Sequence, residues 1–304
     1  MSSGRPAVDV VVVAYNSRDT LRACVEPLAR AGSLDVIVVD NRSPDDSAGV
    51  VADLPVQVIR APRNGGFAYG CNLGIAAGDA EHVLLLNPDA AIEPASVAVL
   101  CDALRADPRL GGVGPRVLRA DGRLAFSQRR FPRLRSTYAQ GLLLHRVAPH
   151  ATWCDEVIRD PAAYERAGSP DWISGCCVLL RRDAVEAVGG LDEGFFLFSE
   201  EIDLFQRLAA AGWRAGFEPA ATASHIGSGS AAPETMEHIQ AYSRVRYARK
   251  HGGPVVALLE GVGVAFGALM HAAMWAARRP ARARGHLQAA RSALGAVRSV
   301  GGTV

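Results

Sequence analysis

The chain has 304 residues, of which 49% are hydrophobic and 21% are charged, and its formal net charge is +2. A chain of this length can bury a full core, and so small a net charge argues against a nucleic-acid partner. The charge is uneven, because residues 1–241 hold 23 basic and 30 acidic side chains, whereas residues 242–304 hold ten basic ones and one acid, Glu260. We therefore predict a main domain over 1–241 and a basic, apolar helical tail over 242–304 that suits an anionic surface.

Short apolar runs alternate with helix-like segments through the first half of the chain. Continuous apolar runs predict strands at Val8–Ala14, Val36–Val39, Val56–Ile59 and His82–Leu86. Apolar spacing predicts helices at 21–28, Asp46–Ala52, Ala68–Ala77 and Pro94–Ala106. The alternation indicates an α/β fold with a Rossmann-like, mostly parallel central sheet flanked by helices, in which residues 8–115 form a nucleotide-binding half.

Polar residues follow each of the four predicted strands. They are Tyr15-Asn16, Asp40-Asn41-Arg42-Ser43, Asn64-Gly65-Gly66-Phe67 and Asn87-Pro88-Asp89. Ligands of open α/β sheets bind beyond the carboxyl ends of the strands, so we predict that these residues meet at one edge. Turn formation explains each motif singly, because Asn, Asp, Gly and Pro are common loop residues, but it explains their coincidence poorly.

The residue types at this edge indicate a nucleotide-diphosphate site. The Asp40 carboxylate can accept hydrogen bonds from a base or a ribose, and Asp89 is placed to ligate a divalent cation that would neutralise a diphosphate. Four glycines open the next helix and are expected to let backbone approach a sugar nucleotide: Gly65, Gly66, Gly70 and Gly74. Their spacing is not GxGxxG, which argues against a dehydrogenase.

The segment 115–170 shows no regular pattern, and we expect irregular structure there. Arginines gather around Phe131 and Pro132: Arg129, Arg130, Arg133 and Arg135. Such a loop can hold a lipid-diphosphate acceptor or contact a membrane, and a solvated arginine face is the alternative. Further on, Trp172 offers either a flat apolar platform for a sugar or a core side chain.

The run Phe195–Phe205 sets three carboxylates, those of Glu200, Glu201 and Asp203, among aromatic and aliphatic side chains. Apolar neighbours raise the pKa of a carboxylate, and a second carboxylate raises it further, so the run predicts a general base that works near neutral pH. The same pattern suits the start of a helix, with Ser199 as its cap and acids in the first turn. The two interpretations are compatible.

The tail begins with a helix-like stretch, Tyr242–Arg249, that is expected to break at 251–254. Val255–Ala277 is apolar apart from Glu260 and His271, and four arginines follow within 278–284. Its length suffices to span a bilayer, but Glu260 would be costly in hydrocarbon. Three alternatives stay open: an interfacial hairpin or amphipathic helix, packing in the core or in a homodimer, and a true span. The charge split favours the first, with peripheral association at the cytoplasmic face of the membrane.

The six cysteines show neither a CxxC pair nor the spacing of zinc ligands, and no secretory signal precedes them: Cys24, Cys71, Cys101, Cys154, Cys176 and Cys177. We therefore expect a reduced, cytoplasmic protein in which the cysteines are small buried hydrophobic residues. A metal site built on thiolates is not expected.

Several motifs in a fixed order carry a family resemblance. They are Val11–Asn16, Val38–Ser43, Asn64–Gly74, Leu86–Asp89, Trp172–Cys176, Gly189–Glu193, Phe196–Leu204, and His225 with Gly227 and Ser230. Over about residues 8–250 the chain resembles family-2 inverting glycosyltransferases of the GT-A fold, close to bacterial rhamnosyltransferases that use dTDP-rhamnose. The resemblance implies an acceptor and catalytic half at about 116–241.

The resemblance also implies roles for individual residues. Asp40 matches the acid that binds the base, and Asp89 matches the last acid of a DxD motif that binds Mg²⁺ or Mn²⁺. His225 resembles a histidine that completes the metal site, whereas Asn87 replaces the first acid of the motif. Further candidates for donor contacts are Tyr15, Asn16, Asn41, Asn64, Gly65, Gly66 and Asn72. Trp172 and Gly175 are candidates for contact with the sugar or the acceptor.

The catalytic base of the family falls on Glu201, where aspartate is the usual residue. The extra methylene shifts the carboxylate by about 1.5 Å, so either the backbone compensates or Glu200 or Asp203 shares the role. The implied reaction is a direct displacement at the anomeric carbon with inversion of configuration. The implied partners are a dTDP-, UDP- or GDP-sugar and a cell-envelope glycan or polyprenyl-diphosphate-linked acceptor.

Two other functions stay open at this point. A sugar-phosphate nucleotidyltransferase would share the nucleotide-binding half, but such enzymes usually carry a basic glycine-rich loop after the first strand, which Tyr15–Arg18 is not. A non-catalytic carbohydrate-binding or scaffold protein would need neither a metal-binding acid nor an acidic pair.

Overall fold

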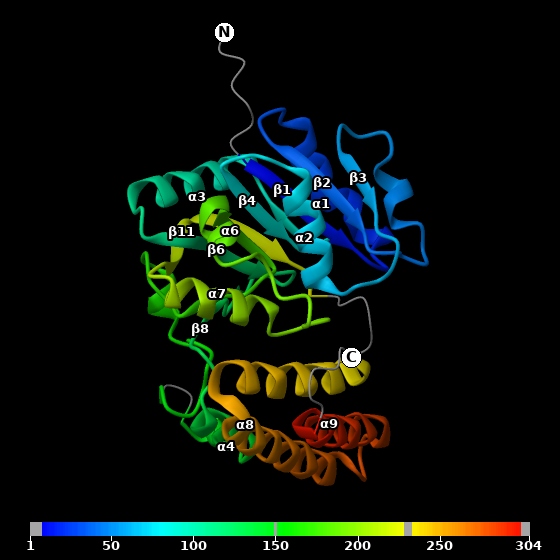
Figure 1. The fold of residues 1–304 in the computed structure, drawn as a ribbon, viewed down its shortest axis with the longest axis vertical. Coiled ribbons are helices and arrows are strands. Elements are labelled where there is room, and N and C mark those ends of the chain that lie inside the picture. Colours follow the sequence, from blue (N-terminus) through cyan, green and yellow to red (C-terminus); the bar gives the residue numbers. More distant parts are fainter. Residues whose placement is uncertain (1–7, 149–150, 228–232, 299–304) are drawn as a thin grey trace.

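The fold is a central sheet with helices on both faces and a further layer of helices beneath it (Figure 1). This computed structural model describes residues 8–148, 151–227 and 233–298. The lower layer consists of α4 (Leu134–Gly141), α8 (Pro233–Trp275) and α9 (Pro280–Arg298), which pack against one another. We call these three helices the helical layer.

The first half of the sheet is parallel, in the order β3-β2-β1-β4. Its strands are β1 (Val8–Ala14), β2 (Asp35–Asp40), β3 (Gln57–Arg60) and β4 (His82–Leu86). These bounds agree with the predicted runs to within one residue at every end. Every residue of β1 and β4 is buried, which explains why both strands have continuous apolar sequences rather than alternating ones.

The second half of the sheet is mixed. β10 (Cys177–Arg181) runs antiparallel between β4 and β6 (Leu110–Arg119), and β11 (Arg214–His225) then runs parallel to β6. The remaining strands are β5 (Ala90–Ile92), which pairs with β11, β7 (Leu124–Ala125), which pairs with β6, and a small separate sheet of β8 (Gln128–Arg129) and β9 (Trp172–Ile173).

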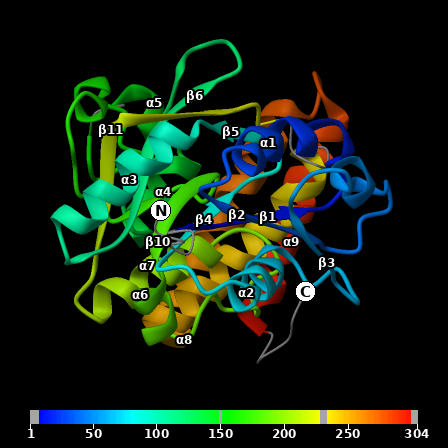
Figure 2. The same ribbon diagram turned by 90° about the horizontal axis from the view of Figure 1, so that it is seen from above.

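The two faces of the sheet carry different helices (Figure 2). On one face lie α1 (Arg18–Arg30) and α3 (Pro94–Ala106), and on the other α2 (Phe67–Ala77), α6 (Arg182–Ala187) and α7 (Glu200–Ala210). The alternation of β1 fixes this division, because Val10 and Val12 pack with the first group whereas Val11 and Val13 pack with the second. A short 3₁₀ helix, η1 (Ser47–Val51), follows β2.

Two glycines of α2 have a different role from the one predicted. A Cβ at Gly70 would lie 2.6 Å from Val13 Cγ1, and one at Gly74 would lie 2.3 Å from Val11 Cγ1. Both glycines therefore face β1 and allow the helix to approach the sheet closely. The prediction that they let backbone approach a nucleotide was wrong, because their missing side chains point away from the strand ends.

The segment predicted to be irregular contains helices. Besides α4, it holds α5 (Leu144–Val147) and the 3₁₀ helix η2 (Pro161–Tyr164). The sequence of α4 has no run of strongly apolar residues, so its periodicity is weak. Its stability comes instead from tertiary contact, since Gly141 and Gly267 let α4 and α8 approach so closely that a Cβ on either glycine would lie 2.8–3.0 Å from the other backbone.

The break predicted in the tail is present at Gly253, whose φ of 81° interrupts α8. Before the break, α8 packs on the main domain, where Ser243 Oγ donates to the Leu197 carbonyl at 2.8 Å and Tyr247 is buried in the core. After it, the helix pairs with α9 as a hairpin. The expected domain boundary at residue 241 therefore falls inside a helix that joins both parts.

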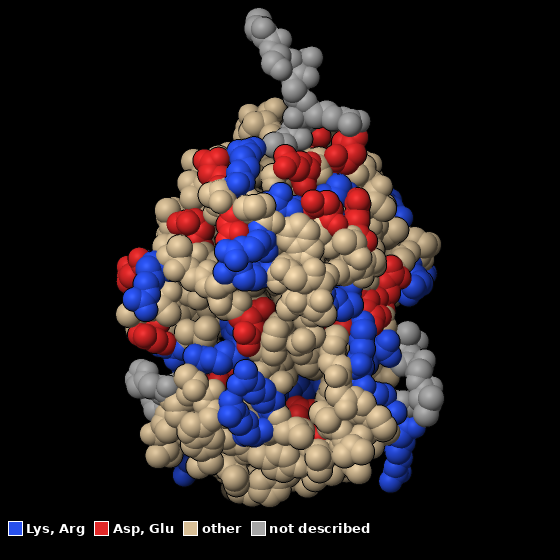
Figure 3. All heavy atoms as spheres, turned by 60° about the vertical axis from the view of Figure 1, so that its left-hand side comes forward, with Lys and Arg blue, Asp and Glu red and all other residues tan. Residues whose placement is uncertain are grey.

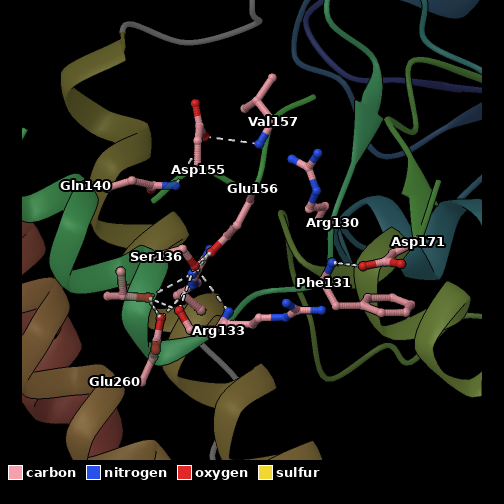
Figure 4. A network of polar contacts seen from close by, with 12 residues as sticks. Arg130, Phe131, Arg133, Ser136, Gln140, Asp155, Glu156, Val157, Asp171 and Glu260 are labelled. Atoms are coloured by element: carbon pink, nitrogen blue, oxygen red, sulfur yellow. Dashed lines mark hydrogen bonds and ion pairs between the residues drawn. The ribbon is translucent and has the colours of Figure 1, made fainter. Parts of the chain in front are cut away.

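Glu260, the lone acid of the tail, is buried and paired. Its carboxylate accepts from Arg244 Nε at 2.6 Å and from Thr137 Oγ1 at 2.6 Å. Arg244 also donates to Glu156, whose other partner is the Ser136 hydroxyl at 2.7 Å. Figure 4 shows this cluster between α4 and α8. The acid therefore faces the inside of the helical layer, not a surrounding solvent or lipid.

The opposite side of α8 is apolar and exposed. Its exposed side chains recur every three or four residues: Val255, Leu258, Leu259, Val262, Phe266, Leu269, Met270 and Met274. We call these eight residues the apolar stripe. Figure 3 shows the lower end of the molecule almost free of charged atoms, with basic side chains (blue) toward its margins. Within the described residues, one helical segment, Met236–Trp275, is long and apolar enough to cross a membrane, although 44% of its most apolar window is buried.

Candidate active site

The carboxyl ends of the parallel strands bring the predicted polar residues together. Asp40 ends β2 with its carboxylate almost fully buried, where it accepts from the Ser43 backbone N–H at 2.8 Å and pairs with Arg60 at 3.3 Å. Tyr15 and Asn16 follow β1 with exposed side chains, and the Asn16 N–H donates to the Ser43 hydroxyl at 2.7 Å. The ends of β1 and β2 thus form one continuous edge, as predicted.

The loop Asn64–Phe67 is fastened to this edge by asparagine side chains. Asn41 Nδ2 donates to Asn64 Oδ1 and to the Gly66 carbonyl, both at 3.0 Å, and Asn41 Oδ1 accepts from the Gly65 N–H at 3.2 Å. Asn64 Oδ1 also accepts from the Gly66 N–H at 3.1 Å. Because the Asn41 and Asn64 amides form these hydrogen bonds within the protein, they hold the loop in its conformation.

The same loop touches the segment that carries the acidic pair. The Phe67 N–H donates to the Phe196 carbonyl at 2.8 Å, and Gly66 has a φ of 87°. A Cβ at Gly66 would lie 2.1 Å from the Phe196 oxygen, so only glycine fits here. The strand-end edge and the acidic run therefore belong to one site, although about 130 residues separate them in the sequence.

Asn72, another candidate for a donor contact, lies on α2 and binds a different loop. Its amide donates to the Leu191 carbonyl and to Glu193 Oε1, each at 2.9 Å, and accepts from the Leu191 N–H at 3.0 Å. This side chain joins α2 to the Gly189–Glu193 motif. We therefore expect Asn72 to hold that loop in place.

Asp89 and His225 lie side by side, as the metal-site prediction requires. The His225 Nε2 atom is 3.0 Å from Asp89 Oδ1 and 3.4 Å from Asn87 Nδ2. Pairing of β11 with β5 places His225 opposite Ala90, directly after Asp89. A carboxylate oxygen and an imidazole nitrogen fit Mn²⁺ or Mg²⁺, which usually take few protein ligands together with waters and phosphate oxygens. Within the described ranges, no three His, Cys, Asp or Glu side chains form a metal-holding group, so substrate oxygens would complete the coordination.

Glu200 and Glu201 open α7 from a strained turn. Phe198 and Ser199 both have positive φ, at 67° and 68°, a conformation that non-glycine residues adopt at a cost of about 1–3 kcal/mol. The Ser199 side chain makes no capping hydrogen bond. The helix start was thus predicted correctly, but its capping by Ser199 was wrong. The turn places Glu200 and Glu201 in the first turn of α7, directly after the segment that contacts the Asn64–Phe67 loop.

The two glutamates differ in their surroundings. Burial raises the pKa of Glu200 well above its usual range, and the neighbouring Glu201 carboxylate raises it further. Burial also raises the pKa of Glu201, but the helix backbone, the Arg129 charge and the Gly175 N–H oppose this rise. The pair titrates together, and a shared proton favours Glu200. The surroundings of Glu201 thus favour its charged form, the form that a base needs, more than those of Glu200 do.

Asp203 is unsuited to act as a base. It is fully buried and accepts from Arg207 at 2.8 Å, Lys250 at 2.7 Å and His251 at 2.8 Å. Burial alone would raise its pKa, but the hydrogen bonds from His251 and Lys250 and the charge of Arg207 lower it to about 2. The carboxylate instead anchors the first part of α8 to α7.

Trp172 and Gly175 are the two candidates for contact with the sugar or the acceptor, and their surroundings differ. Trp172 is 7% exposed, and its indole N–H donates to the Arg130 carbonyl at 3.0 Å. The small exposure supports the prediction that Trp172 is a core side chain rather than a platform for a sugar. The Cα of Gly175 faces Glu201, whose side-chain carbons lie 3.7–3.8 Å from where a Cβ would be. A larger residue at 175 would touch the expected base.

Sequence reasoning did not single out Glu156 and Asp155. Both are buried, and they connect the 155–157 segment with Ser136, Gln140 and Arg244. Acids in an irregular stretch look like surface residues, and the only signal was the isolated Glu260, whose charge required a buried partner. All six cysteines are free and buried, as expected.

The architecture matches solved glycosyltransferases. A mannosyltransferase from Pyrobaculum calidifontis, solved with GDP-Man and Mn²⁺, aligns with a TM-score of 0.55 and 17% identity over 96% of this chain and 87% of its own. GalNAc-T7, solved with UDP, GalNAc and Mn²⁺, aligns with a TM-score of 0.57 and 14% identity over 82% of this chain and 51% of its own. These structures share the GT-A fold, and the chain has that fold.

Sequence comparison places the chain within a family. A model of glycosyl transferase family 2 matches residues 9–189. The N-acetylglucosaminyl-diphospho-decaprenol L-rhamnosyltransferase of Mycobacterium tuberculosis (strain CDC 1551 / Oshkosh) is 30% identical over 263 residues, which cover 80% of this chain and 85% of that protein. A pre-mycofactocin glycosyltransferase of the same strain is 28% identical over 76% of this chain and 48% of its own length. The chain belongs to glycosyl transferase family 2.

Proposed function

We propose that the protein is an inverting glycosyltransferase that moves a sugar from a nucleotide-diphosphate sugar to a hydroxyl group of a lipid-linked or glycan acceptor of the cell envelope. The observation that carries the proposal is the contact between the Asn64–Phe67 loop and Phe196, which joins the nucleotide edge to the acidic pair. Rhamnose is the donor sugar that we favour, because a relative of 30% identity bears that activity in its name.

The nucleotide would lie along the ends of β1 and β2. There the exposed Tyr15 ring can stack on the base, and Asp40 can accept from the base or the ribose. The diphosphate would then point toward Asp89 and His225. A divalent cation held there would neutralise the negative charge that develops on the departing nucleotide. The Mn²⁺ in both structural relatives supports this choice.

The residues of this chain perform the remaining steps. Glu201 accepts the proton of the acceptor hydroxyl, and the oxygen bonds to the anomeric carbon while the bond to the nucleotide diphosphate breaks. Attack from the face opposite the nucleotide inverts the configuration. The Gly175 N–H and Arg129 hold the Glu201 carboxylate in its charged form. Burial and the Glu201 charge raise the pKa of Glu200, which favours its protonated form.

The test is a release assay with dTDP-rhamnose, UDP-sugars and GDP-sugars and a lipid-diphosphate-linked N-acetylglucosamine acceptor. We expect acceptor-dependent release of nucleoside diphosphate in Mn²⁺ or Mg²⁺, and loss of that release with EDTA. Asp89→Asn should weaken metal-dependent release by at least tenfold, whereas Asp121→Asn, at an exposed turn, should not. Release of pyrophosphate would point to nucleotidyl transfer, and no release from any donor would reject the proposal.

We further propose that the protein lies on the cytoplasmic face of the membrane, with the apolar stripe in the lipid surface. The stripe faces outward, and Trp275 at its end contacts Arg279 and Arg282, whose guanidinium carbons lie 5.7 Å and 4.8 Å from the ring centroid. Tryptophan and arginine side by side suit the boundary between acyl chains and anionic headgroups. The buried Glu260 removes the objection that its charge would enter lipid.

Introducing charge into the apolar stripe should release the protein from lipid. The double variant Leu258→Glu/Leu269→Glu is expected to lose co-sedimentation with vesicles of phosphatidylcholine and phosphatidylglycerol, because two exposed apolar contacts become anionic. Val58→Glu, on the exposed edge strand β3, serves as the matched control. A wild-type dimer that this double variant converts to a monomer, without vesicle binding, would show that the stripe pairs two copies instead.

A further inference from the structure

A cavity of about 460 Å³ lies between the main domain and the helical layer. Its walls come from both parts: Arg129, Trp172 and Ile202 on one side, and residues of α4, α8 and α9 on the other. Ile202 follows the expected base directly in α7, so the cavity begins one residue from the reaction centre. A pocket of this size can hold a sugar diphosphate or the first units of a lipid chain.

The charged side chains in the wall of this cavity are paired with one exception. Arg159 pairs with Asp155 at 2.5 Å, Arg244 pairs with Glu156 and Glu260, and His286 pairs with Glu237 at 2.7 Å. The Arg129 guanidinium has no hydrogen bond or ion pair to any described residue, and its Nε is buried without a partner. The guanidinium lies over the Trp172 ring, with its Cζ atom 5.7 Å from the ring centroid.

A guanidinium in a cavity wall without a hydrogen bond or ion pair to the protein suits the binding of an anion. Burial lowers the pKa of Arg129, yet an arginine in a protein remains charged, so the cavity holds a cation without a counter-charge in contact. Glu201 is near enough to influence that charge but forms no ion pair with it. A planar guanidinium offers two parallel donors, the arrangement that suits phosphate oxygens.

The far wall of the cavity is lined by small residues. Gly141, Gly263, Gly267, Ala268 and Ala289 line it, where α4, α8 and α9 meet. These five residues carry no polar side chain and leave room for a slender apolar chain. The same helices also contribute polar side chains elsewhere in the wall: Thr137, Gln140, Glu237, Gln240, Arg244, His271 and His286. The cavity thus combines the cationic side chain of Arg129 on the main-domain side with a patch of small residues in the helical layer.

We infer that this cavity is the acceptor subsite, in which Arg129 binds the diphosphate of a lipid-diphosphate-linked sugar while the small-residue wall takes the start of the lipid chain. The inference rests on the proposed function, because the bound molecule is an acceptor only if the protein transfers a sugar to it. The sugar attached to that diphosphate would then reach Glu201, which lies on the same side of the cavity. Neither the nucleotide edge nor the metal pair takes part in this contact.

Direct binding tests the subsite without any transfer reaction. Geranyl diphosphate, inorganic pyrophosphate and geraniol are titrated calorimetrically into the full chain, with dTDP, UDP and GDP present to occupy the nucleotide site. We expect geranyl diphosphate to bind most tightly, pyrophosphate less tightly and geraniol not measurably. Arg129→Gln should weaken geranyl diphosphate binding by roughly 10- to 100-fold, the range for a lost hydrogen bond to a charged group. Arg129→Lys should recover part of it.

Arg130→Gln is the matched control, because Arg130 lies next in sequence but its side chain points away from the buried cluster in Figure 4 and does not line the cavity. In the transfer assay, Arg129→Gln should raise the acceptor KM with little change in the donor KM. Equal binding of geranyl diphosphate by Arg129→Gln and the wild type, or none by a folded wild type, overturns the subsite. Arg129-dependent binding without any sugar transfer would leave the subsite standing and reject the proposed function.

Discussion

Replacing Glu201 with glutamine is expected to reduce sugar transfer by about 10²- to 10⁴-fold, the usual contribution of a general base. The amide keeps the shape of the side chain and its place beside Gly175 but cannot accept the hydroxyl proton. Nucleotide binding should be retained, because Tyr15 and Asp40 lie at the ends of β1 and β2, whereas Glu201 lies on α7. Initial rates of nucleoside diphosphate release, together with calorimetric titration of the nucleotide, measure the two effects separately.

Glu186→Gln, an exposed glutamate on α6, is the control and should leave the rate unchanged. The pH profile adds a second measurement. Because burial raises the pKa of Glu201, the rate should fall as the pH decreases at a value above about 4.3, the ordinary pKa of glutamate. A Glu201→Gln enzyme with normal turnover would remove Glu201 as the base.

Replacing Arg244 with methionine is expected to destabilise the protein by about 3–5 kcal/mol, the usual effect of breaking a buried ion pair from one side. Burial alone would lower the pKa of Arg244, but Glu156 and Glu260 more than reverse this effect. Without the guanidinium, both buried carboxylates lose their charged partner. Urea unfolding followed by circular dichroism measures the change in the free energy of unfolding.

Arg291→Met is the matched control, since Arg291 lies on an exposed face of α9 and its loss should change stability by no more than about 0.5 kcal/mol. The triple variant Arg244→Met/Glu156→Gln/Glu260→Gln should recover much of the stability, because it removes the unpaired charges as well. An Arg244→Met protein as stable as the wild type would mean that water solvates the two acids in the folded state.

The sequence predicted the half of the fold in which local pattern and tertiary environment agree. The strands β1 and β4 are buried on both faces, so their composition is continuously apolar and their limits can be read directly. The helix α4 was missed, because what holds it is a glycine contact with α8 and a buried ion cluster, neither of which has a local signature. The predicted break in the tail is present, because Gly253-Pro254 is a strong local signal.

The candidate site also has a part that the sequence predicted and a part that it did not. Strand ends bring Asp40 and Asp89 to one edge by topology alone, and the prediction followed from that rule. The partners of individual side chains are set by segments far away in sequence, so reasoning from residue type could not foresee that Asp203 pairs with Lys250 or that Asn72 binds Leu191. Arg129 looked like one of four loop arginines until its place in the wall of the cavity distinguished it.

The cluster of Arg244, Glu156 and Glu260 makes the connection between the helical layer and the main domain rigid. It ties the helix that bears the apolar stripe to the segment beside Arg129 through buried charge-assisted bonds, which resist bending more than a flexible linker would. If the apolar stripe lies in the lipid surface as proposed, this rigid connection would hold Glu201 at a fixed height above the headgroups. An acceptor would be chosen by the distance between its lipid and its free hydroxyl, and each added sugar would carry the product out of reach.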